Sequence, residues 1–448
     1  MANNELKIPS HWRCKRLVDC TSNKNISYGI VQPGQHTDDG IGIIRVNNFD
    51  NGEINTSDVL KVSENIESKF EKTRLEGGEV LLTLVGSTGQ SAVVPGELKG
   101  WNVARAVAVI RPSDEVTADW LNMCLQSENT KHFLDARANT TVQKTLNLKD
   151  VKDIPVPLPP DDERKKLEDI YISYKNKINL NRQINQTLEQ MAQALFKSWF
   201  VDFDPVVDNA LDAGFFEQDL DLPDELLRRA ETRRVVRERG EFKQLPEATR
   251  RLFPAAFEEC AEPSIGLGGW VPKGWNIKKI ENLMELVYGK ALKSTDRIDG
   301  PVPVYGSGGI TGYHNESMVD GPSIIIGRKG TVGSLYWEDK PFFPIDTVFY
   351  VRSEKPITYC FYLLQTLGLA DMNTDAAVPG LNRNNVYRLQ ATTPDDDLLN
   401  AFDTLVTTLR KRIFANKEQL TTLINLRDSL LPKLISGELS LDKMESVL

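Results

Sequence analysis

Two long segments of the chain carry apolar residues at steps of three and four, the spacing that places them on one face of an α-helix. The first stripe covers residues 167–199 and the second covers residues 398–434. At 1.5 Å per residue the stripes are about 48 and 54 Å long. Acidic residues precede both stripes, at 161–163 and 395–397, where they favour a helix start. Because each stripe is narrow, we expect the two helices to pair as a coiled coil; the alternative is that each packs on its neighbouring globular part.

Outside these helices, short runs of β-branched residues bounded by Gly, Asn, Asp or Pro predict strands. In the first half of the chain such runs lie at 41–46, 80–84 and 104–110, followed by a helical period over 120–133. A proline-rich run at 154–160 then predicts an extended exit, because each proline keeps its predecessor out of the helical region. The pattern therefore predicts an α+β protein, with two mixed α/β domains separated by two long helices.

The changes of pattern divide the chain into five regions. We expect a first globular domain at 1–157, a central helical spacer at 158–204, an acidic connector at 205–263, a second globular domain at 264–393, and a distal helical spacer and tail at 394–448. The connector holds 9 basic and 14 acidic residues, whereas the second globular domain holds 13 and 12. More than half of the net charge of −9 therefore lies in the connector.

The two halves of the chain repeat one plan. Four features recur in the same order: a Pro-x-x-Trp start, a Gly-x-x-Gly turn after an apolar strand, a Leu-Asn pair, and a leucine in the long helix. Their positions in the first and second copies are 9–12 and 272–275, 86–89 and 330–333, 146–147 and 381–382, and 188 and 423. Four matches in one order indicate a duplicated architecture.

Composition excludes several classes of protein. The 448 residues are 40% hydrophobic and 26% charged, which argues against global disorder. The N-terminal residues lack the apolar stretch of a signal peptide, and no apolar run reaches the ~18–20 residues of a membrane helix. Five scattered cysteines indicate a reducing cytosol, with neither a disulfide framework nor a zinc site. The net charge argues against coating nucleic acid through bulk positive charge and predicts weak non-specific DNA affinity for the isolated chain.

Catalytic signatures are absent from the sequence. It has no G-x-x-x-x-G-K-[ST] phosphate loop, no H-E-x-x-H motif, and no Asn-Pro-Pro-Tyr or Asp-Pro-Pro-Tyr of an amino-methyltransferase. The four histidines are not spaced as metal ligands. The glycine-rich run at 305–312 fails as a dinucleotide loop, because Thr311 falls where the third glycine belongs. We therefore expect no catalytic residue, no metal and no cofactor on this chain.

The glycine-rich turns are candidates for contact with DNA. A turn with backbone N–H groups and cations can approach a phosphate closely, and an arginine can donate to a guanine edge. The candidates in the second copy are Tyr305, Ser307, Tyr313, Asn315, Arg328, Lys329 and Thr331. Those in the first copy are Ser87, Thr88 and Gln90, with Arg105 or Lys144 as nearby cations. The alternative is that both segments are solvated β-turns that need glycine for a positive φ.

Four aromatic residues lie within eight positions at the end of the first long helix. They are Phe196, Trp199, Phe200 and Phe203. A two-helix seam needs fewer aromatics than this, so we expect Phe196, Trp199 and Phe200 to bind a partner protein. The alternative is that they pack against the connector that follows Pro205.

These features together resemble the specificity subunit of a type I restriction-modification system. The resemblance rests on the helical run at 181–205, the Leu146-Asn147 segment leading to the prolines at 154–160, the two Pro-x-x-Trp starts, and the glycine segments at 304–309 and 327–330. It covers essentially the whole chain. Each glycine motif is weak alone, but their order together with the long helical repeat is specific.

The resemblance implies a fold and a function. Two target-recognition domains would each read one half of a split site in double-stranded DNA, and the antiparallel helical pair would set the spacing between the halves. Two methyltransferase subunits would dock on the helical regions and bring S-adenosylmethionine for adenine methylation. Restriction subunits would add ATP- and Mg-dependent translocation and cleavage. The chain itself would be a cytoplasmic, non-catalytic subunit away from membranes.

A different class of function is a coiled-coil assembly scaffold whose globular ends bind proteins rather than DNA. A steep salt dependence of DNA binding separates the two hypotheses, because phosphate contacts release counterions. An enzyme with an unrecognised site is disfavoured by the lack of clustered His, Cys or paired carboxylates in a motif context.

Overall fold

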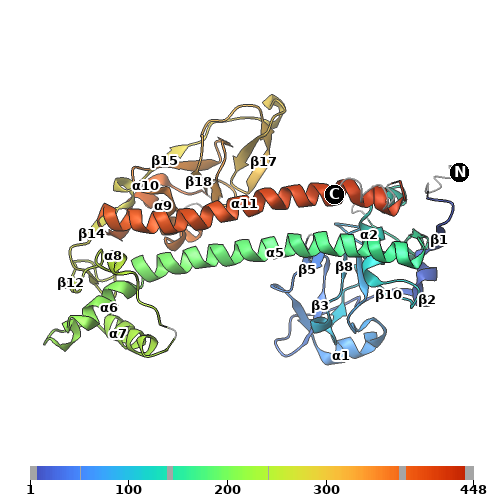
Figure 1. Cartoon of the computed structure of the whole chain (residues 1–448), viewed down its shortest axis with the longest axis horizontal. Coiled ribbons are helices and arrows are strands. Elements are labelled where there is room, and N and C mark those ends of the chain that lie inside the picture. The colour runs from blue at the N-terminus through green and yellow to red at the C-terminus, as the bar shows by residue number, and fades with distance from the viewer. Residues whose placement is uncertain (1–7, 51, 139–144, 241, 373–379, 439–448) are drawn as a thin grey trace. The chain divides into compact units, whose positions relative to one another are not determined.

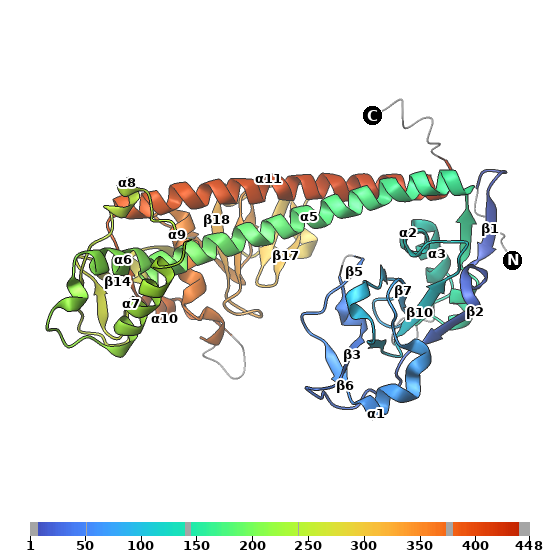
Figure 2. The same cartoon turned by 60° about the horizontal axis from the view of Figure 1, so that its bottom comes forward.

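The computed structural model describes residues 8–50, 52–138, 145–240, 242–372 and 380–438 (Figure 1). Its contacts divide the chain into two compact units, one of Met1–Asn181 with Gln419–Leu448 and the other of Arg182–Glu418. Both units contain sheets together with part of each long helix (Figure 2). We describe each unit by itself.

The first unit is built on a four-stranded sheet with the order β2-β10-β7-β8. Its strands are β2 Thr21–Tyr28, β10 Val107–Pro112, β7 Val80–Thr83 and β8 Ser91–Val93. A three-stranded sheet β6-β3-β9 and two-stranded pairs β1-β11 and β4-β5 complete it. Their bounds are β6 Leu60–Val62, β3 Ile41–Ile44, β9 Asn102–Val103, β1 Arg13–Arg16, β11 Pro155–Leu158, β4 Phe49–Asp50 and β5 Glu53–Ile54. The predicted strands at 41–46, 80–84 and 104–110 are confirmed as β3, β7 and β10.

The predicted single helix over 120–133 is wrong in one respect. The structure has two helices here, α2 Ala118–Gln126 and α3 Glu128–Asp135. Ser127 between them adopts an extended backbone, and its Oγ accepts a hydrogen bond from the backbone N–H of Thr130 at 3.2 Å. A serine in this position caps a new helix and ends the previous one. The first unit also contains the short α-helices α1 Glu64–Glu67 and α4 Leu148–Lys152.

The second unit repeats the sheet plan of the first. Its sheets have the orders β15-β21-β18-β19 and β17-β16-β20, with the pairs β14-β22 and β12-β13. The bounds are β12 Phe257–Glu259, β13 Trp270–Pro272, β14 Asn276–Lys279, β15 Glu285–Tyr288, β16 Val302–Gly306, β17 Gly309–His314, β18 Ser323–Gly327, β19 Leu335–Glu338, β20 Phe343–Pro344, β21 Val348–Arg352 and β22 Gln390–Thr393. Its short helices are α9 Ile357–Thr366 and α10 Arg383–Arg388.

The register confirms the duplication. In both three-stranded sheets the central strand has one antiparallel and one parallel neighbour: β3 pairs with β6 and β9, and β16 pairs with β17 and β20. In both four-stranded sheets the corresponding strand is antiparallel to both of its neighbours: β10 lies between β2 and β7, and β21 lies between β15 and β18. The repeat seen in the sequence therefore corresponds to a repeat of strand topology.

The two long helices, α5 Asp161–Phe200 and α11 Asp396–Ile435, pack together in an antiparallel pair. In the first unit, the Asn181 Nδ2 donates to Gln419 Oε1 at 3.3 Å. In the second unit, the Asn416 Nδ2 donates to Asn185 Oδ1 at 2.9 Å. Residue numbers thus rise along α5 as their partners' numbers fall along α11. Pairing is confirmed, and the helices also pack on the globular parts of their own units.

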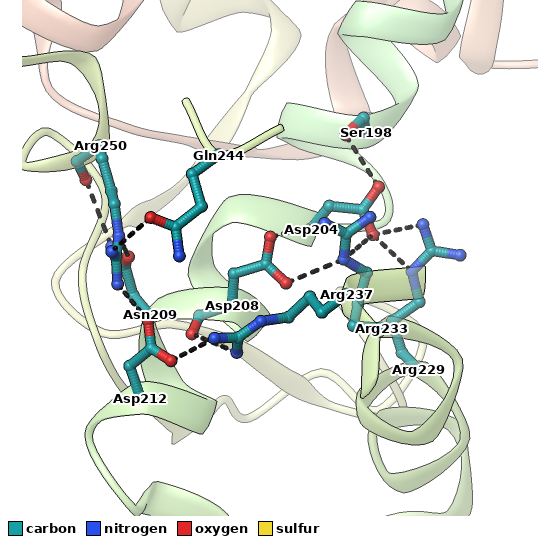
Figure 3. Close-up of polar contacts among 10 residues, drawn as sticks. All are labelled: Ser198, Asp204, Asp208, Asn209, Asp212, Arg229, Arg233, Arg237, Gln244 and Arg250. Atoms are coloured by element: carbon teal, nitrogen blue, oxygen red, sulfur yellow. Dashed lines mark hydrogen bonds and ion pairs between the residues drawn. The ribbon is translucent and has the colours of Figure 1, made fainter. Parts of the chain in front are cut away.

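The described part of the connector includes helices of the second unit, α6 Asp204–Asp212, α7 Asp224–Arg237 and α8 Glu247–Arg250. Carboxylates spaced four residues apart on α6 face guanidinium groups spaced four apart on α7, which Figure 3 shows as a ladder of ion pairs. The pairs are Asp204 with Arg229, Asp208 with Arg233, and Asp212 with Arg237, and Arg250 adds a second partner for Asp212. Among the described residues, four of the 14 acidic residues at 205–263 form ion pairs with arginines of the connector: Asp208, Asp212, Glu231 and Glu247.

Candidate nucleic-acid interface

The two glycine turns have the same backbone geometry. In the first, the N–H of Gly89 donates to the carbonyl of Thr83 at 3.0 Å; in the second, the N–H of Gly333 donates to the carbonyl of Gly327 at 2.8 Å. Gly86, Gly89, Gly330 and Gly333 all have φ between 72° and 84°. Glycine is therefore required here for the turn itself, as the β-turn alternative holds. The turns nevertheless present the side chains between their glycines at matching positions.

The residues that precede each turn also correspond in their hydrogen bonds. The N–H of Arg328 donates to the carbonyl of Thr347, and the carbonyl of Arg328 accepts from the N–H of Leu381. In the first copy, the N–H of Leu84 donates to the carbonyl of Ala106, and the carbonyl of Leu84 accepts from the N–H of Leu146. Arg328 thus takes the place of Leu84. The same frame holds a cation in one domain and an apolar side chain in the other.

The structure brings some of the second-domain candidates together. The N–H of Thr331 lies 3.4 Å from Ser307 Oγ, and Ser334 Oγ donates to the carbonyl of Ser307 at 2.6 Å. Lys329 is exposed beside them. The Ser307 end of the β16–β17 hairpin therefore adjoins the glycine turn and could offer hydroxyl groups and a cation to one ligand.

Other second-domain candidates lie apart from the turn. Tyr313 and Asn315 are exposed, but they lie at the end of β17 away from the hairpin turn, where Tyr313 pairs with Pro303. Tyr305 is buried, and its hydroxyl donates to Glu338 Oε2 at 2.7 Å. Burial, together with this carboxylate, raises the pKa of Tyr305. The structure thus places Tyr305 in the core rather than on a reading surface, because β16 is buried along most of its length.

The first-domain candidates form a less charged surface. Ser87 and Gln90 are exposed and Thr88 is half-buried. The carbonyl of Ser87 accepts from Thr83 Oγ1 at 2.5 Å, which fixes the turn from inside. Arg105 is exposed and its backbone N–H donates to the carbonyl of Ile30 at 2.8 Å. Lys144 lies outside the described residues.

The aromatic cluster predicted to bind a partner is covered by the chain itself. Phe196, Trp199 and Phe200 are all buried. Phe196 and Phe200 contact Phe402 of α11 with ring centroids 5.8 and 5.1 Å apart, and Trp199 contacts Phe253 of the connector at 5.0 Å. These three side chains therefore leave almost no surface for a partner. The contact of Trp199 with Phe253 agrees with the alternative interpretation, in which these aromatics pack on the connector. The contacts with Phe402 show that the paired helix α11 covers them as well.

One group of residues near the second turn is not among the candidates identified from the sequence. Tyr288 ends β15 and is followed by Gly289, and Tyr28 ends β2 and is followed by Gly29. Tyr28 lies opposite Ala108, and Tyr288 lies opposite the corresponding residue Phe349. A Cβ on either glycine would lie within 2.1 Å of a backbone carbonyl oxygen, so only glycine fits. The repeated Tyr-Gly pair is the signal that could have located these tyrosines.

Clusters of metal-ligating residues and membrane-spanning helices are both missing from the described part of the chain. No group of three or more His, Cys, Asp or Glu residues there could hold a metal ion. Among the same residues, no helix combines the length and the apolar character needed to cross a membrane. The candidate interface consists of hydrogen-bonding groups and cations around two glycine turns.

Comparison with known proteins gives one family for both copies. Residues 25–190 and 272–426 match the model of the type I restriction modification DNA specificity domain. The HindI specificity subunit of Haemophilus influenzae is 26% identical over 82% of this chain and 88% of its own length. The EcoBI specificity subunit of Escherichia coli is 30% identical over 42% of this chain and 40% of its own length. The S subunit of the type I system of M. genitalium has a similar fold, with a TM-score of 0.52 at 15% identity over 97% of both chains.

Proposed function

The chain belongs to the type I restriction modification DNA specificity family, and from this premise we propose how it performs the family's task. Each of its two target-recognition domains reads one half of a bipartite site in double-stranded DNA. By doing so the chain directs adenine methylation or restriction, which partner subunits carry out. We assign the first recognition domain to 1–157, the second to 264–393, and the spacer roles to 158–204 and 394–448.

One observation carries this proposal. The two glycine turns share their backbone hydrogen bonds and positive φ angles, yet they present different side chains on that common frame. Base readout depends on the donors, acceptors and methyl-contacting groups that reach the groove, whereas backbone atoms position them. Two equal frames with unequal side chains are what reading two different half-sites requires.

The chemistry of modification is assigned to partner subunits. We propose that two methyltransferase subunits bind S-adenosylmethionine and assemble on the helical regions, and that restriction subunits contribute ATP- and Mg-dependent cleavage in the cytoplasm. The chain's own part is to hold the complex on its site. The burial of Phe196, Trp199 and Phe200 favours a docking surface on other, exposed faces of α5 and α11.

The test is methylome sequencing of cells that carry this chain with its methyltransferase partner. A new bipartite adenine-methylation motif is expected. Exchanging residues 12–156 for those of a relative should change one half of the motif, and exchanging 275–393 should change the other half. Absence of new methylation with a competent partner, or a motif that changes in both halves with either exchange, would contradict the proposal.

The spacer role has its own test. Adding one helical turn to both α5 and α11 lengthens the pair by about 5.4 Å. The gap between the two half-sites should then change while the bases within each half stay the same. An unaltered gap in a folded, active variant would show that the helix pair does not set the spacing.

A further inference from the structure

The exposed ring of Tyr288 is the meeting point of two guanidinium groups in the second recognition domain. Tyr288 is 46% exposed at the end of β15. The Cζ of Arg328 lies 5.2 Å from the ring centroid, and the Cζ of Arg383 lies 5.0 Å from it. Three segments distant in sequence thus place two cations against one aromatic ring. Such contacts hold a guanidinium without neutralising it.

Both guanidinium groups are fixed by neutral acceptors. Arg328 donates through Nε and Nη2 to the carbonyl of Asp346, at 3.2 and 2.7 Å. Arg383 donates through Nη1 to the carbonyl of Leu286 at 3.4 Å, and its Cζ lies 5.6 Å from the ring of Tyr387. The Nε of Arg383 is buried without a hydrogen-bond partner among the described residues.

Neither arginine of this cluster forms an ion pair among the described residues, although exposed Asp346 is the residue whose carbonyl accepts from Arg328. Within the described residues, neither arginine has a carboxylate oxygen within 4.0 Å, whereas other cations of the second unit, such as Lys355 and Arg410, do have ion-pair partners. Lys329 follows Arg328 directly and is exposed, and Lys290, also exposed, follows two residues after Tyr288. Cations that are held in place but unpaired form the electrostatic footprint of an anion-binding surface.

The first domain lacks this cluster although it shares the frame. Its counterpart of Tyr288 is Tyr28, which is 43% exposed. Leu84 stands where Arg328 stands, by the shared backbone bonds. Leu148 corresponds to Arg383, because each is the first residue of a helix, α4 or α10. Each also comes two positions after a leucine, Leu146 or Leu381, whose N–H donates to the residue before the glycine turn. The positive charge at these positions is thus a property of the second domain alone.

We propose that Tyr288, Arg328 and Arg383 form a binding site for DNA backbone phosphates, through which the second domain supplies a salt-sensitive anchor that the first domain lacks. The proposal rests on the proposed DNA-reading function. A guanidinium packed against an aromatic ring can present its remaining N–H groups to the oxygens of a phosphate, and such charge-assisted contacts are strong and directional. The anchor fixes the register of the second half-site without specifying its bases.

The experiment measures DNA affinity against salt concentration. The full chain, assembled with its methyltransferase subunits, is titrated with a fluorescent duplex that carries the motif found by methylome sequencing. The slope of log K against log salt is negative, and each lost phosphate contact reduces its magnitude by about 0.9. The double variant Arg328→Gln/Arg383→Gln is therefore expected to reduce the magnitude of the slope by about 1.8. The matched control is Arg352→Gln, because Arg352 also lies over a tyrosine ring, 5.3 Å from the centroid of Tyr350, but at the other end of β21. The control is expected to keep the wild-type slope.

A second variant separates charge from geometry and guards against misfolding. Arg328→Lys/Arg383→Lys keeps both charges but loses the two-pronged donor, so it should keep most of the slope while binding more weakly than the wild type. Thermal unfolding shows that each variant is folded.

Three results would overturn the proposal. A slope unchanged in the glutamine variant would mean that the cluster does not contact phosphates. A methylation motif that becomes degenerate at one position in that variant, with the slope kept, would assign the arginines to a base edge instead. Failure of the wild-type complex to methylate or bind any motif would refute the proposed function itself, and this outcome is recognised before any variant is compared.

Discussion

Arg410 of α11 is the buried cation that joins the long helices to the second recognition domain. Its side chain is 7% exposed, and Nη1 donates to Glu189 Oε2 of α5 at 2.5 Å. Its guanidinium also lies 4.3 Å from the ring centroid of Trp337 in β19 and 4.8 Å from that of Phe361 in α9. Its Cζ also lies 5.9 Å from the ring centroid of Tyr362, so replacing Arg410 by alanine breaks an ion pair and three ring contacts at one point.

The expected loss can be worked out from these contacts. Removing one partner of a buried ion pair costs about 3–5 kcal/mol, and the lower value applies because Glu189 keeps 28% of its side chain exposed. The lost ring contacts add about 1 kcal/mol. In the opposite direction, Nε and Nη2 of Arg410 are buried without hydrogen-bond partners in the described structure, and removing them recovers about 1 kcal/mol. The net loss for Arg410→Ala is thus about 3 kcal/mol.

Urea denaturation of the full chain measures this loss as a shift in the transition of the second unit. The matched control is Arg412→Ala, since Arg412 is exposed on the same helix, and its effect should stay within about 0.5 kcal/mol. The double variant Arg410→Met/Glu189→Leu should recover most of the stability, because it removes both charges and keeps apolar volume. A loss below about 1 kcal/mol for Arg410→Ala would refute the view that this side chain fixes the second domain to the helices.

Three further changes test other parts of the structure, each measured by urea denaturation. Asn416→Leu leaves the side chain of Asn185 on α5 without its partner and should lower the free energy of unfolding by about 1–2 kcal/mol. The double variant Asn185→Leu/Asn416→Leu should be close to neutral, because it removes both polar groups. The hydrogen bond from Arg74 holds the pKa of Glu67 below its ordinary 4.5, so the stability that this carboxylate contributes is complete above about pH 4.5 and is lost as the pH falls. Glu67→Gln should therefore reduce the loss of stability at acid pH. An unchanged dependence of stability on pH in this variant would contradict the reasoning. Gly289→Ala places a Cβ 2.1 Å from the carbonyl oxygen of Ile345 and should cost about 2–3 kcal/mol, while Gly96→Ala, which meets nothing within 4 Å, should cost far less.

The helical architecture was predictable because its signal is local and long. The apolar stripe at 167–199 lies within α5, and the stripe at 398–434 lies within α11. A stripe that persists over about nine helical turns is typical of a long helix and of no other regular structure. The sequence also indicated pairing of the helices, although the direction of pairing came from the family resemblance. The amide pairs such as Asn185 with Asn416 show the register that the stripe alone does not contain.

The candidate site was predictable only in part, since exposure depends on contacts between distant segments. Tyr305 belongs to a glycine-rich run, yet its strand faces the core and its hydroxyl is taken by Glu338. Phe196 and Trp199 exceed the needs of a two-helix seam, but the connector folds back and its Phe253 covers the excess. Neither outcome is visible in the local pattern, because both depend on what another part of the chain does.

The comparison of the two copies explains why turns are easier to predict than the chemistry they carry. Position 333 requires glycine because its φ is 72° and because a Cβ there would lie 2.3 Å from the backbone of Leu369. Arg328 and Leu84 are held in the frame by their backbone N–H and carbonyl groups, which any residue except proline supplies. The frame thus constrains the glycines and leaves the neighbouring side chains free to change from apolar to cationic. A recognition domain built in this way can acquire a new DNA contact at such a position without altering the fold that presents it.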